Sequence, residues 1–536
     1  MADVFDTAFL DEAMMKTLTA NQASWIYNGL DCCVTAEIYN VLQEEINSDP
    51  EVQETYATAL DKLAPYMEME LHGVYINKEV RDKKIKELTE TYNEVREKFD
   101  YLCTELFDGP FNPASPMQIK SLFYTCLGFK EIKKRNSNGI FAATVNEEAL
   151  EKLKVHLFAL PFCNMILIMR GISKSLGFLR TQIDEDSRIR TGYNIAGTNT
   201  GRLSSAYSDF GSGTNLQNVD RSLREPFEAD PGMIFLNIDL EQADARNVGA
   251  RLWETFYDYD AKDIARLLGK KSWTGAVGPE FAGHYLDACE GGDLHTTVSR
   301  MCWPNLAWPE DPAEWKKFCD GIMFHRQDSY RQSAKKLGHG TNYFGKPPNM
   351  AAQTHIPTIL VKAFQDNYFE EFPAIPAWHA WVINKIEETG VLYNLFGRRR
   401  HFFGRGNDAS TWRAAIAYDP QSSTGEEIDR GLLQVYRHFP STVVQPLLQV
   451  HDSILFQIPY SEHADLIPEI LNVMQVNKEL KGGRMFHVPL EAQIGWNWGK
   501  YDYDNPNVNP YGLVKWKGKA DERNRPAPIR RFKDYL

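Results

Sequence analysis

The chain has 536 residues, of which 43% are hydrophobic and 24% are charged, and its formal net charge is −13. This length is enough for about two to four domains, and the composition is that of an ordinary globular protein, which excludes the disordered class. The eight cysteines include no CxxC pair, so the sequence indicates neither a zinc site nor a disulfide framework.

No stretch of the sequence indicates a membrane segment or a secretory signal. The longest apolar run, residues 160–169, contains a proline and an asparagine and is too short to cross a bilayer. The N-terminus opens with acidic residues, whereas a signal peptide opens with basic and then apolar ones. We therefore expect a cytoplasmic protein with reduced thiols and no membrane partner.

The negative net charge conceals several basic clusters, at residues 133–135, 270–271, 397–401 and 523–533. Salt screens charges beyond about 8–10 Å, so local charge decides what a surface binds. These clusters permit binding to nucleic acid, although a basic run is more often a solvated face.

In chain order, the first third of the sequence predicts helices. Residues 1–60 predict short helices, the last of which runs to about Glu45. Apolar residues between Val80 and Leu102 recur at helical spacing and predict a long amphipathic helix whose apolar stripe is core. Further helical patterns at residues 147–157 and 162–179 make residues 61–190 a mostly helical unit.

A loop of small polar residues around Arg202 follows, at residues 200–205 and 215–218. This composition suits hydrogen bonding to a nucleic-acid backbone or minor groove, although an ordinary surface loop has the same appearance. Farther on, residues 253–324 mix aromatics, prolines and charges, and predict only one helix, near His295.

The apolar run at residues 233–238 follows a turn signal at residues 230–232 and ends at Asp239. It predicts a buried strand with a carboxylate at its tip, followed by a helix. Such a junction can hold a hard divalent cation through the carboxylate and a neighbouring carbonyl. Taken alone, an aspartate after a strand is more often a helix N-cap.

The clearest spacing in the sequence is a set of four side chains at every fourth position: Arg331, Lys335, His339 and Tyr343. On a helix this set forms one slowly drifting face about 18 Å long, which begins with two cations and ends with two rings. The face suits a nucleoside triphosphate whose phosphates pair with the cations. An exposed basic helix is the alternative, but Gly338 and Gly340 weaken a helix unless something approaches closely.

A second carboxylate is predicted at the tip of a β-hairpin. After a predicted helix at residues 413–436, two apolar strands at residues 447–458 flank a polar tip that contains Asp452. A plain tight turn is the simpler interpretation. However, two strands that each end at an aspartate, with a phosphate-binding helix between them in sequence, provide what two-metal phosphoryl transfer requires.

In this order, the three stretches resemble motifs A, B and C of the family A DNA polymerases, the class of bacterial DNA polymerase I and its phage relatives. The matching residues are Asp239, Gln242 and Arg246 in motif A, Arg331, Lys335, Tyr343 and Gly345 in motif B, and Gln449, His451 and Asp452 in motif C. Residues 200–205 and 215–218 resemble the family's primer-contacting loop, His295 its fingers histidine, and Arg413 with Gln421 its minor-groove readers.

The resemblance implies an α+β right-hand polymerase fold, in which an antiparallel palm sheet carries the two aspartates and the fingers and thumb are helical. The implied domains are a remnant of the 3′–5′ exonuclease domain (1–60), the thumb (61–200), the palm (201–260 and 396–500), the fingers (261–395) and a C-terminal tail of no assigned role (501–536).

The resemblance also implies template-directed addition of dNTPs to a primer 3′-hydroxyl, in the replication of a phage genome in the host cytoplasm. Two Mg²⁺ ions, which Mn²⁺ could replace, would be held by Asp239, Asp452 and the carbonyl of Leu240. Lys335 would act in catalysis. The implied dNTP-binding residues are Arg331, Lys335, His339, Tyr343, His295, Gln242 and Asp244, and the implied DNA-binding residues are Arg202, Asn215, Gln217, Arg413, Gln421 and His451.

Four positions depart from the family's pattern: Asp244 stands where Glu is usual, His339 where another aromatic is usual, Ser453 where an acid follows the motif C aspartate, and Ala417 where Asn is common. Two alternatives remain. A single-subunit RNA polymerase shares both aspartates but lacks an acid at the position of Asp244. A catalytically inactive nucleic-acid-binding subunit would not need both metal ligands and Lys335.

Tyr27 and Asp31 resemble the final motif of the family's exonuclease domain. The preceding acids, Asp3, Asp6, Asp11 and Glu12, fall in a helical pattern with no strand to carry an Asp-x-Glu pair. We therefore expect no proofreading by this chain alone. The expected partners are primer-template DNA, dNTPs, and a separate exonuclease subunit or other replication proteins; alternatively, residues 1–60 are a relic that buttresses the thumb.

Overall fold

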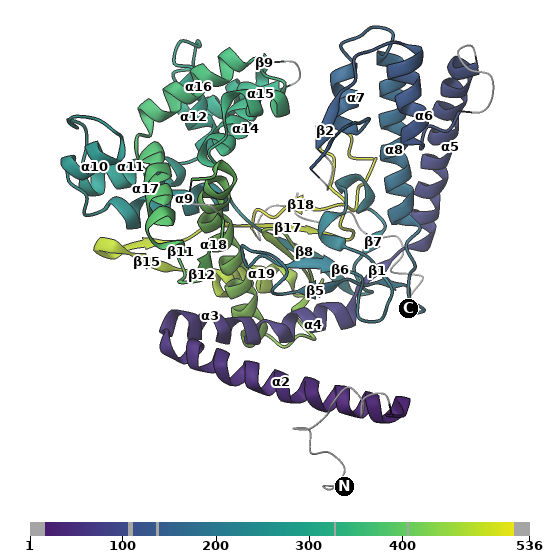
Figure 1. Ribbon diagram of the computed structural model, residues 1–536, viewed down its shortest axis with the longest axis horizontal. Coiled ribbons are helices and arrows are strands. Elements are labelled where there is room, and N and C mark those ends of the chain that lie inside the picture. The colour runs from purple at the N-terminus through teal and green to yellow at the C-terminus, as the bar shows by residue number, and fades with distance from the viewer. Residues whose placement is uncertain (1–16, 105–110, 136–138, 326–327, 405–406, 519–536) are drawn as a thin grey trace. The chain divides into compact units, whose positions relative to one another are not determined.

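The structure is a computed structural model that describes residues 17–104, 111–135, 139–325, 328–404 and 407–518 (Figure 1). The chain divides into two compact units. The first contains the described parts of Met1–Lys62, Asp260–Gly275 and Val298–Asp419, and the second those of Leu63–Tyr259, Ala276–Thr297 and Pro420–Leu536.

The centre of the second unit is a five-stranded antiparallel sheet in the order β13-β14-β8-β17-β18. Its strands are β13 (Gln445–Val450), β14 (Ser453–Pro459), β8 (Met233–Leu240), β17 (Leu490–Gly495) and β18 (Val514–Lys515). The predicted strand before Asp239 and the predicted hairpin around Asp452 are therefore confirmed. β8 pairs with β14 on one side and β17 on the other, and Ile234, Leu236 and Ile238 on one of its faces are completely buried.

The end strand β18 comes from the tail that had no assigned role. It pairs Val514 with Ile494 and Lys515 with Gln493 of β17. The side chain of Lys515 also forms a 2.6 Å ion pair with Glu491. The first part of the tail therefore completes the central sheet.

Two helices of this unit pack at unusually close range. They are α9 (Ala243–Phe256) and α11 (Gly278–Glu290). A Cβ atom at Gly249 of α9 would lie 2.9 Å from the Cα atom of Leu286 on α11. Glycine at this position therefore sets how closely the two helices approach.

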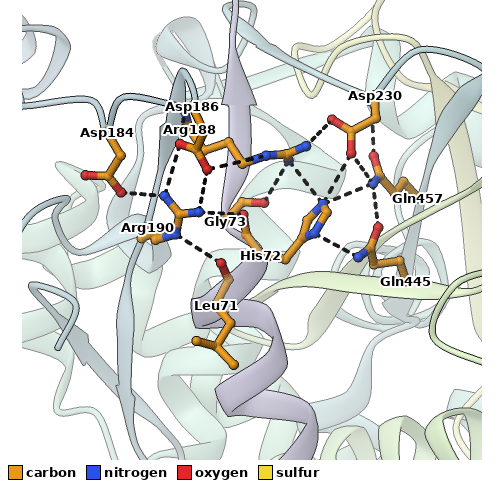
Figure 2. Close-up of polar contacts among 10 residues, drawn as sticks. All are labelled: Leu71, His72, Gly73, Asp184, Asp186, Arg188, Arg190, Asp230, Gln445 and Gln457. Carbon is orange, nitrogen blue, oxygen red and sulfur yellow. Dashed lines mark hydrogen bonds and ion pairs between the residues drawn. The ribbon is translucent and has the colours of Figure 1, made fainter. Parts of the chain in front are cut away.

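A second, three-stranded sheet has the order β4-β1-β7, with β4 (Arg188–Ile189), β1 (Val74–Ile76) and β7 (Phe227–Glu228). A polar network links it to the central hairpin (Figure 2). His72, the last residue of α4 (Leu63–His72), lies 3.2 Å from Asp230 and 2.8 Å from Gln445. Arg188 donates to Asp230 at 2.7 Å. The network therefore fixes β13 and β14 at the end away from Asp452.

The helices α5 (Lys78–Thr104) and α8 (Leu160–Leu179) run side by side (Figure 1). They share a core that contains Phe99, Phe162 and Ile166, which confirms that the predicted apolar stripe is core. Over its full 20 residues α8 is long and apolar enough to span a membrane, unlike the shorter run considered in the sequence. A buried core helix passes the same test, and residues of α8 belong to the core described above.

The remaining elements of this unit are short. They are α6 (Pro116–Lys120), η2 (Ser121–Cys126), β2 (Lys133–Arg135), β3 (Phe141–Ala143), α7 (Glu147–Leu153), β5 (Gly192–Asn194), β6 (Ser204–Ala206), η3 (Leu216–Asn218), η4 (Arg221–Leu223), α19 (His463–Met474), β15 (Lys478–Leu480), η6 (Lys481–Gly483) and β16 (Arg484–Phe486).

In the described part of the first unit, one long helix comes first, so the prediction of separate short helices was wrong for residues 20–48. α2 (Ala20–Ser48) starts at a capping box formed by Thr19 and Gln22 and continues for 29 residues. It is followed by α3 (Pro50–Asp61), whose N-cap is Asp49. The acids from Asp3 to Glu12 and the basic cluster at residues 523–533 lie outside the described residues.

The other elements of this unit are mainly helical. They are α10 (Ala261–Leu267), η5 (Pro312–Glu314), α13 (Trp315–Gly321), β9 (Met323–His325), β10 (Asp328–Ser329), α14 (Tyr330–Asn342), α15 (Pro347–Thr354), α16 (Thr358–Glu371), α17 (Ala374–Thr389), β11 (Val391–Tyr393) and β12 (Arg399–His401). Two further helices contribute residues to both units: α12 (Leu294–Cys302) and α18 (Ala409–His438).

The predicted helix near His295 is confirmed as α12, but α10, α11 and α13 were not predicted. These three helices have only 7 to 13 residues. Glycines and prolines separate them in the sequence, which interrupts the apolar period on which the prediction depended. All eight cysteines are free thiols, as expected.

Candidate active site

Asp239 lies near the end of a strand of the central sheet, and Asp452 lies in the turn before the neighbouring strand. Asp239 is the penultimate residue of β8, and its pairing partner on β14 is Ser453. Asp452 occupies the turn before β14, where its carbonyl accepts a hydrogen bond from the Leu240 amide at 3.1 Å. His451, the other turn residue, has a left-handed φ of 59°. The tight turn thus holds Asp452 beside the end of β8.

The charge around Asp452 bears on whether a divalent cation could bind at this turn. Burial raises the pKa of Asp452, and the negative charge of Asp244 raises it further, whereas Arg202 acts in the opposite direction. A divalent cation would reverse this tendency and keep the carboxylates ionised. Among the described residues there is no cluster of three or more His, Cys, Asp or Glu side chains suited to a metal. The assignment of Asp239, Asp452 and the Leu240 carbonyl as metal ligands therefore stays a prediction.

A second cluster surrounds Asp244 in the first turn of α9. Its Oδ1 atom accepts hydrogen bonds from Arg202 and from Thr424, each at 3.0 Å. Arg202 also donates to the carbonyl of Gln421 at 2.9 Å. The guanidinium stem passes close to Gly425, where an added Cβ would lie 3.2 Å from the Cγ atom of Arg202. The structure thus brings together three residues that the sequence singled out, namely Arg202, Asp244 and Gln421.

The predicted polar loop supports the turn that carries His451. Gln217 is 8% exposed and donates its amide to the side chain of Gln449 at 2.6 Å. Gln449 in turn donates to the His451 carbonyl at 2.5 Å. Asn215 caps η3 and accepts a hydrogen bond from Ser205 at 2.7 Å. These contacts give Gln217 a positioning role, and its expected contact with DNA stays a prediction.

The helix with the four-residue spacing is α14 in the first unit. A capping box formed by Ser329 and Gln332 starts it. Lys335 and His339 are exposed, and the opposite side of the helix is buried. The ring of His339 lies 4.6 Å from the ring of Tyr343 at an interplanar angle of 73°. Arg331 is partly buried, 4.0 Å from Asp320, and Tyr343 is the partly buried C-cap of the helix, so a ligand along all four side chains stays a prediction.

The glycines of α14 do not have the role that the sequence suggested. A Cβ atom at Gly340 would lie 2.8 Å from the methyl group of Met350 on α15, and one at Gly338 would meet only Tyr368, at 3.7 Å. The partner that approaches closely is thus another helix of the same unit. The glycines give no support to a ligand on this face, and the case for one rests on the cations and rings.

The remaining predicted residues are placed as follows. Gln242 has a left-handed φ of 58° before α9, and its buried Oε1 atom accepts no hydrogen bond from the described residues. His295 is partly exposed on α12, and Arg413 is exposed near the start of α18. Tyr27 is 65% exposed on α2, and Asp31 is also exposed.

The sequence did not point to Thr424 or Asn247. Thr424 contacts Asp244 directly, and Asn247 contacts Thr424. Thr424 lies only three positions after Gln421 on α18, but its contact with Asp244 joins residues 180 positions apart. No local pattern could have predicted this pairing.

Comparisons with known proteins identify the family that the sequence matches. The model of the DNA polymerase family A matches residues 82–252 and 321–500. The chain is similar to DNA polymerase I of Treponema pallidum, with 23% identity over 497 residues that cover 89% of the chain and 43% of the relative. It is also similar to the thermostable DNA polymerase I of Thermus aquaticus, with 24% identity over 424 residues that cover 75% of the chain and 43% of the relative.

A solved structure has a similar fold: the POL domain of Pol1 from M. smegmatis in complex with DNA primer-template and dNTP. The TM-score is 0.67 at 20% identity, and the match covers 88% of this chain and 75% of that one. This likeness confirms the expected α+β polymerase fold. The chain spans less than half the length of the two bacterial relatives.

Proposed function

Because the chain belongs to the DNA polymerase family A, we propose that it extends a DNA primer along a template by adding nucleotides from dNTPs. The observation that carries this proposal is the pair of carboxylates, Asp239 and Asp452, that two adjacent strands bring to one end of the central sheet. Phosphoryl transfer to a primer needs such a pair to hold divalent cations.

In this proposal Asp239, Asp452 and the Leu240 carbonyl would hold two Mg²⁺ ions, or Mn²⁺ in their place. When bound, these ions would activate the primer 3′-hydroxyl and neutralise charge on the triphosphate. Arg331 and Lys335 pair with the phosphates, and Lys335 is also suited to donate a proton to the leaving pyrophosphate. The exposed position of Lys335 on α14 leaves its ammonium group accessible.

The other residues bind the nucleotide and the DNA. His339, Tyr343, His295 and Gln242 contact the nucleotide, and Asp244 faces its sugar. Arg202, Asn215, Gln217, Arg413, Gln421 and His451 contact the primer-template. In this proposal the thumb, palm and fingers keep the boundaries that the resemblance implies.

The departures at Asp244, His339, Ser453 and Ala417 favour a phage enzyme that replicates its genome in the host cytoplasm. A further partner is a separate exonuclease subunit that covers α2. In support of this, apolar side chains at Tyr27, Leu30, Val34 and Ile38 are 48–65% exposed, and they share one side of the helix.

Primer extension with each dNTP and each rNTP tests the proposal and its alternatives. A DNA polymerase extends the primer according to the template and prefers dNTPs. Preferential use of rNTPs would instead support an RNA polymerase, and the absence of extension with either sugar would support an inactive binding subunit.

A further inference from the structure

A chain of hydrogen bonds leads from the interior of the second unit to Asp244. Its four members, in order, are Glu427, Asn247, Thr424 and Asp244. The Nδ2 atom of Asn247 is 2.9 Å from the Oε2 atom of Glu427 and 3.1 Å from the Oγ1 atom of Thr424. Thr424 Oγ1 is 3.0 Å from Asp244 Oδ1.

The three inner members are buried. Asn247 is 0% exposed, Thr424 1% and Glu427 3%. Polar groups cost free energy in a core unless they are hydrogen-bonded. Asn247 Oδ1 and Glu427 Oε1 are buried without a hydrogen-bond partner among the described residues, so burying these side chains carries a cost. An apolar contact between α9 and α18 would be simpler to build, so the polar chain indicates that the position of Asp244 matters.

The hydrogen bonds in this network all donate in a definite direction. The Asn247 amide group has two hydrogens, and it donates one to Glu427 and one to Thr424. Because the Thr424 oxygen accepts from Asn247, its own hydrogen is available as a donor. Two acceptors compete for it, the Pro420 carbonyl at 2.9 Å and the Asp244 carboxylate at 3.0 Å. An ionised carboxylate is the stronger acceptor.

Arg202 supplies the second anchor. Its Nη2 atom donates to the same Oδ1 atom of Asp244 at 3.0 Å. The other oxygen, Oδ2, accepts no hydrogen bond from the described residues. Thr424 and Arg202 approach from different elements, α18 and the loop before β6, so together they fix both the position and the rotation of the carboxylate.

We propose that Thr424, oriented by Asn247, is a positioning residue that fixes Asp244 and thereby sets the discrimination between deoxyribonucleotides and ribonucleotides. This inference rests on the proposed polymerase function, in which Asp244 faces the nucleotide sugar. An aspartate has a short side chain, so its exclusion of a 2′-hydroxyl depends on an anchor that stops it from turning away. Without the threonine hydroxyl, Arg202 alone holds the carboxylate.

Thr424→Val tests the proposal because it removes the hydroxyl and keeps the shape of the side chain. Thr424→Ser is the matched control, since it keeps the hydroxyl. Single-nucleotide extension of a primer-template gives kcat and KM for a dNTP and for the corresponding rNTP. We expect Thr424→Val to lower the dNTP-to-rNTP ratio of kcat/KM by about 5–10-fold, mainly through a lower KM for the rNTP, because one charge-assisted hydrogen bond is lost. Thr424→Ser keeps the parent ratio.

A double-mutant cycle with Asp244→Ala separates positioning from a general structural effect. If Thr424 acts through Asp244, Thr424→Val leaves the ratio of the Asp244→Ala variant unchanged. Equilibrium binding of the same dNTP and rNTP to the protein–primer-template complex gives the ratio without turnover. The proposal is overturned if Thr424→Val keeps the parent ratio within twofold, or if its effect persists without Asp244. If the proposed polymerase function itself is wrong, the result differs: the parent protein extends the primer with neither the dNTP nor the rNTP.

Discussion

At the scale of single residues, the network around Asp230 shows how contacts lower the pKa of a buried carboxyl (Figure 2). Gln457 donates to the Oε1 atom of Gln445 at 2.7 Å, which turns the Gln445 amide toward Nδ1 of His72 at 2.8 Å. The other ring nitrogen, Nε2, lies 3.2 Å from Asp230 and 3.1 Å from the guanidinium of Arg188. Burial alone would raise the pKa of Asp230, but hydrogen bonds from His72, Arg188 and Gln457 hold it well below its usual range.

This network predicts a pH-dependent effect of Asp230→Asn. A carboxyl whose pKa is lowered in the folded state stabilises the protein at pH values above its pKa in the unfolded state. That stabilisation is lost as the pH falls toward the pKa of the folded state. We expect the variant to lose roughly 2 kcal/mol of unfolding free energy at pH 7. The difference from the parent narrows below about pH 4. Urea unfolding of the variant and the parent at pH 7 and at pH 3 measures this difference in unfolding free energy. An equal loss at both pH values would contradict the lowered pKa of Asp230.

Asp244 is the residue at which a single methylene is expected to affect selectivity. Glu at this position would reach farther toward the sugar, because it adds one CH₂ group to the side chain. Asp244→Glu should therefore raise the preference for dNTPs over rNTPs by several fold, on the order of 1 kcal/mol. Competition between a dNTP and its rNTP in primer extension measures this change. An unchanged preference would mean that Asp244 already closes the space at the 2′ position.

At the scale of elements, the periodic patterns predicted β8, the β13–β14 hairpin, α5, α14 and α18. Each is long or has a single buried face, so the local sequence carries the information. The interaction of Asp244 with Thr424 could not be predicted from the sequence, because it depends on the packing of α9 against α18. The continuous helix α2 was also not predicted, since Gly29 and Asp31 interrupt its pattern although nothing approaches the glycine within 4 Å.

The packing of α9 against α11 predicts a large effect of one methyl group. Gly249→Ala would gain about 1 kcal/mol of helix propensity. However, its Cβ atom would lie 2.9 Å from the backbone of Leu286, so the helices must separate, and we expect a net loss of about 1–3 kcal/mol. Gly177→Ala on α8 is the matched control, because nothing lies within 4 Å of that position. Thermal unfolding should show a lower Tm for the first variant and an equal or higher Tm for the second.

At the scale of the whole molecule, we predict that the chain does not proofread by itself. A hydrolytic two-metal site needs several converging carboxylates, whereas Asp31 is exposed on α2, a helix of which only Ile26 is buried. The purified chain, incubated with a mismatched primer and Mg²⁺ but no nucleotides, should release no 3′-terminal nucleotide. Shortening of the primer that disappears in Asp31→Ala would show that the exonuclease site is complete.

The central claim is that Asp239 and Asp452 hold the cations that drive nucleotide transfer. It is tested most directly by measuring primer extension and primer-template affinity together for Asp239→Ala, Asp452→Ala and the parent. Removal of either carboxylate should lower the extension rate by at least about a thousandfold. The dissociation constant for primer-template should stay within a few fold, because the acids bind ions and not DNA. Substantial extension by either variant would contradict the account.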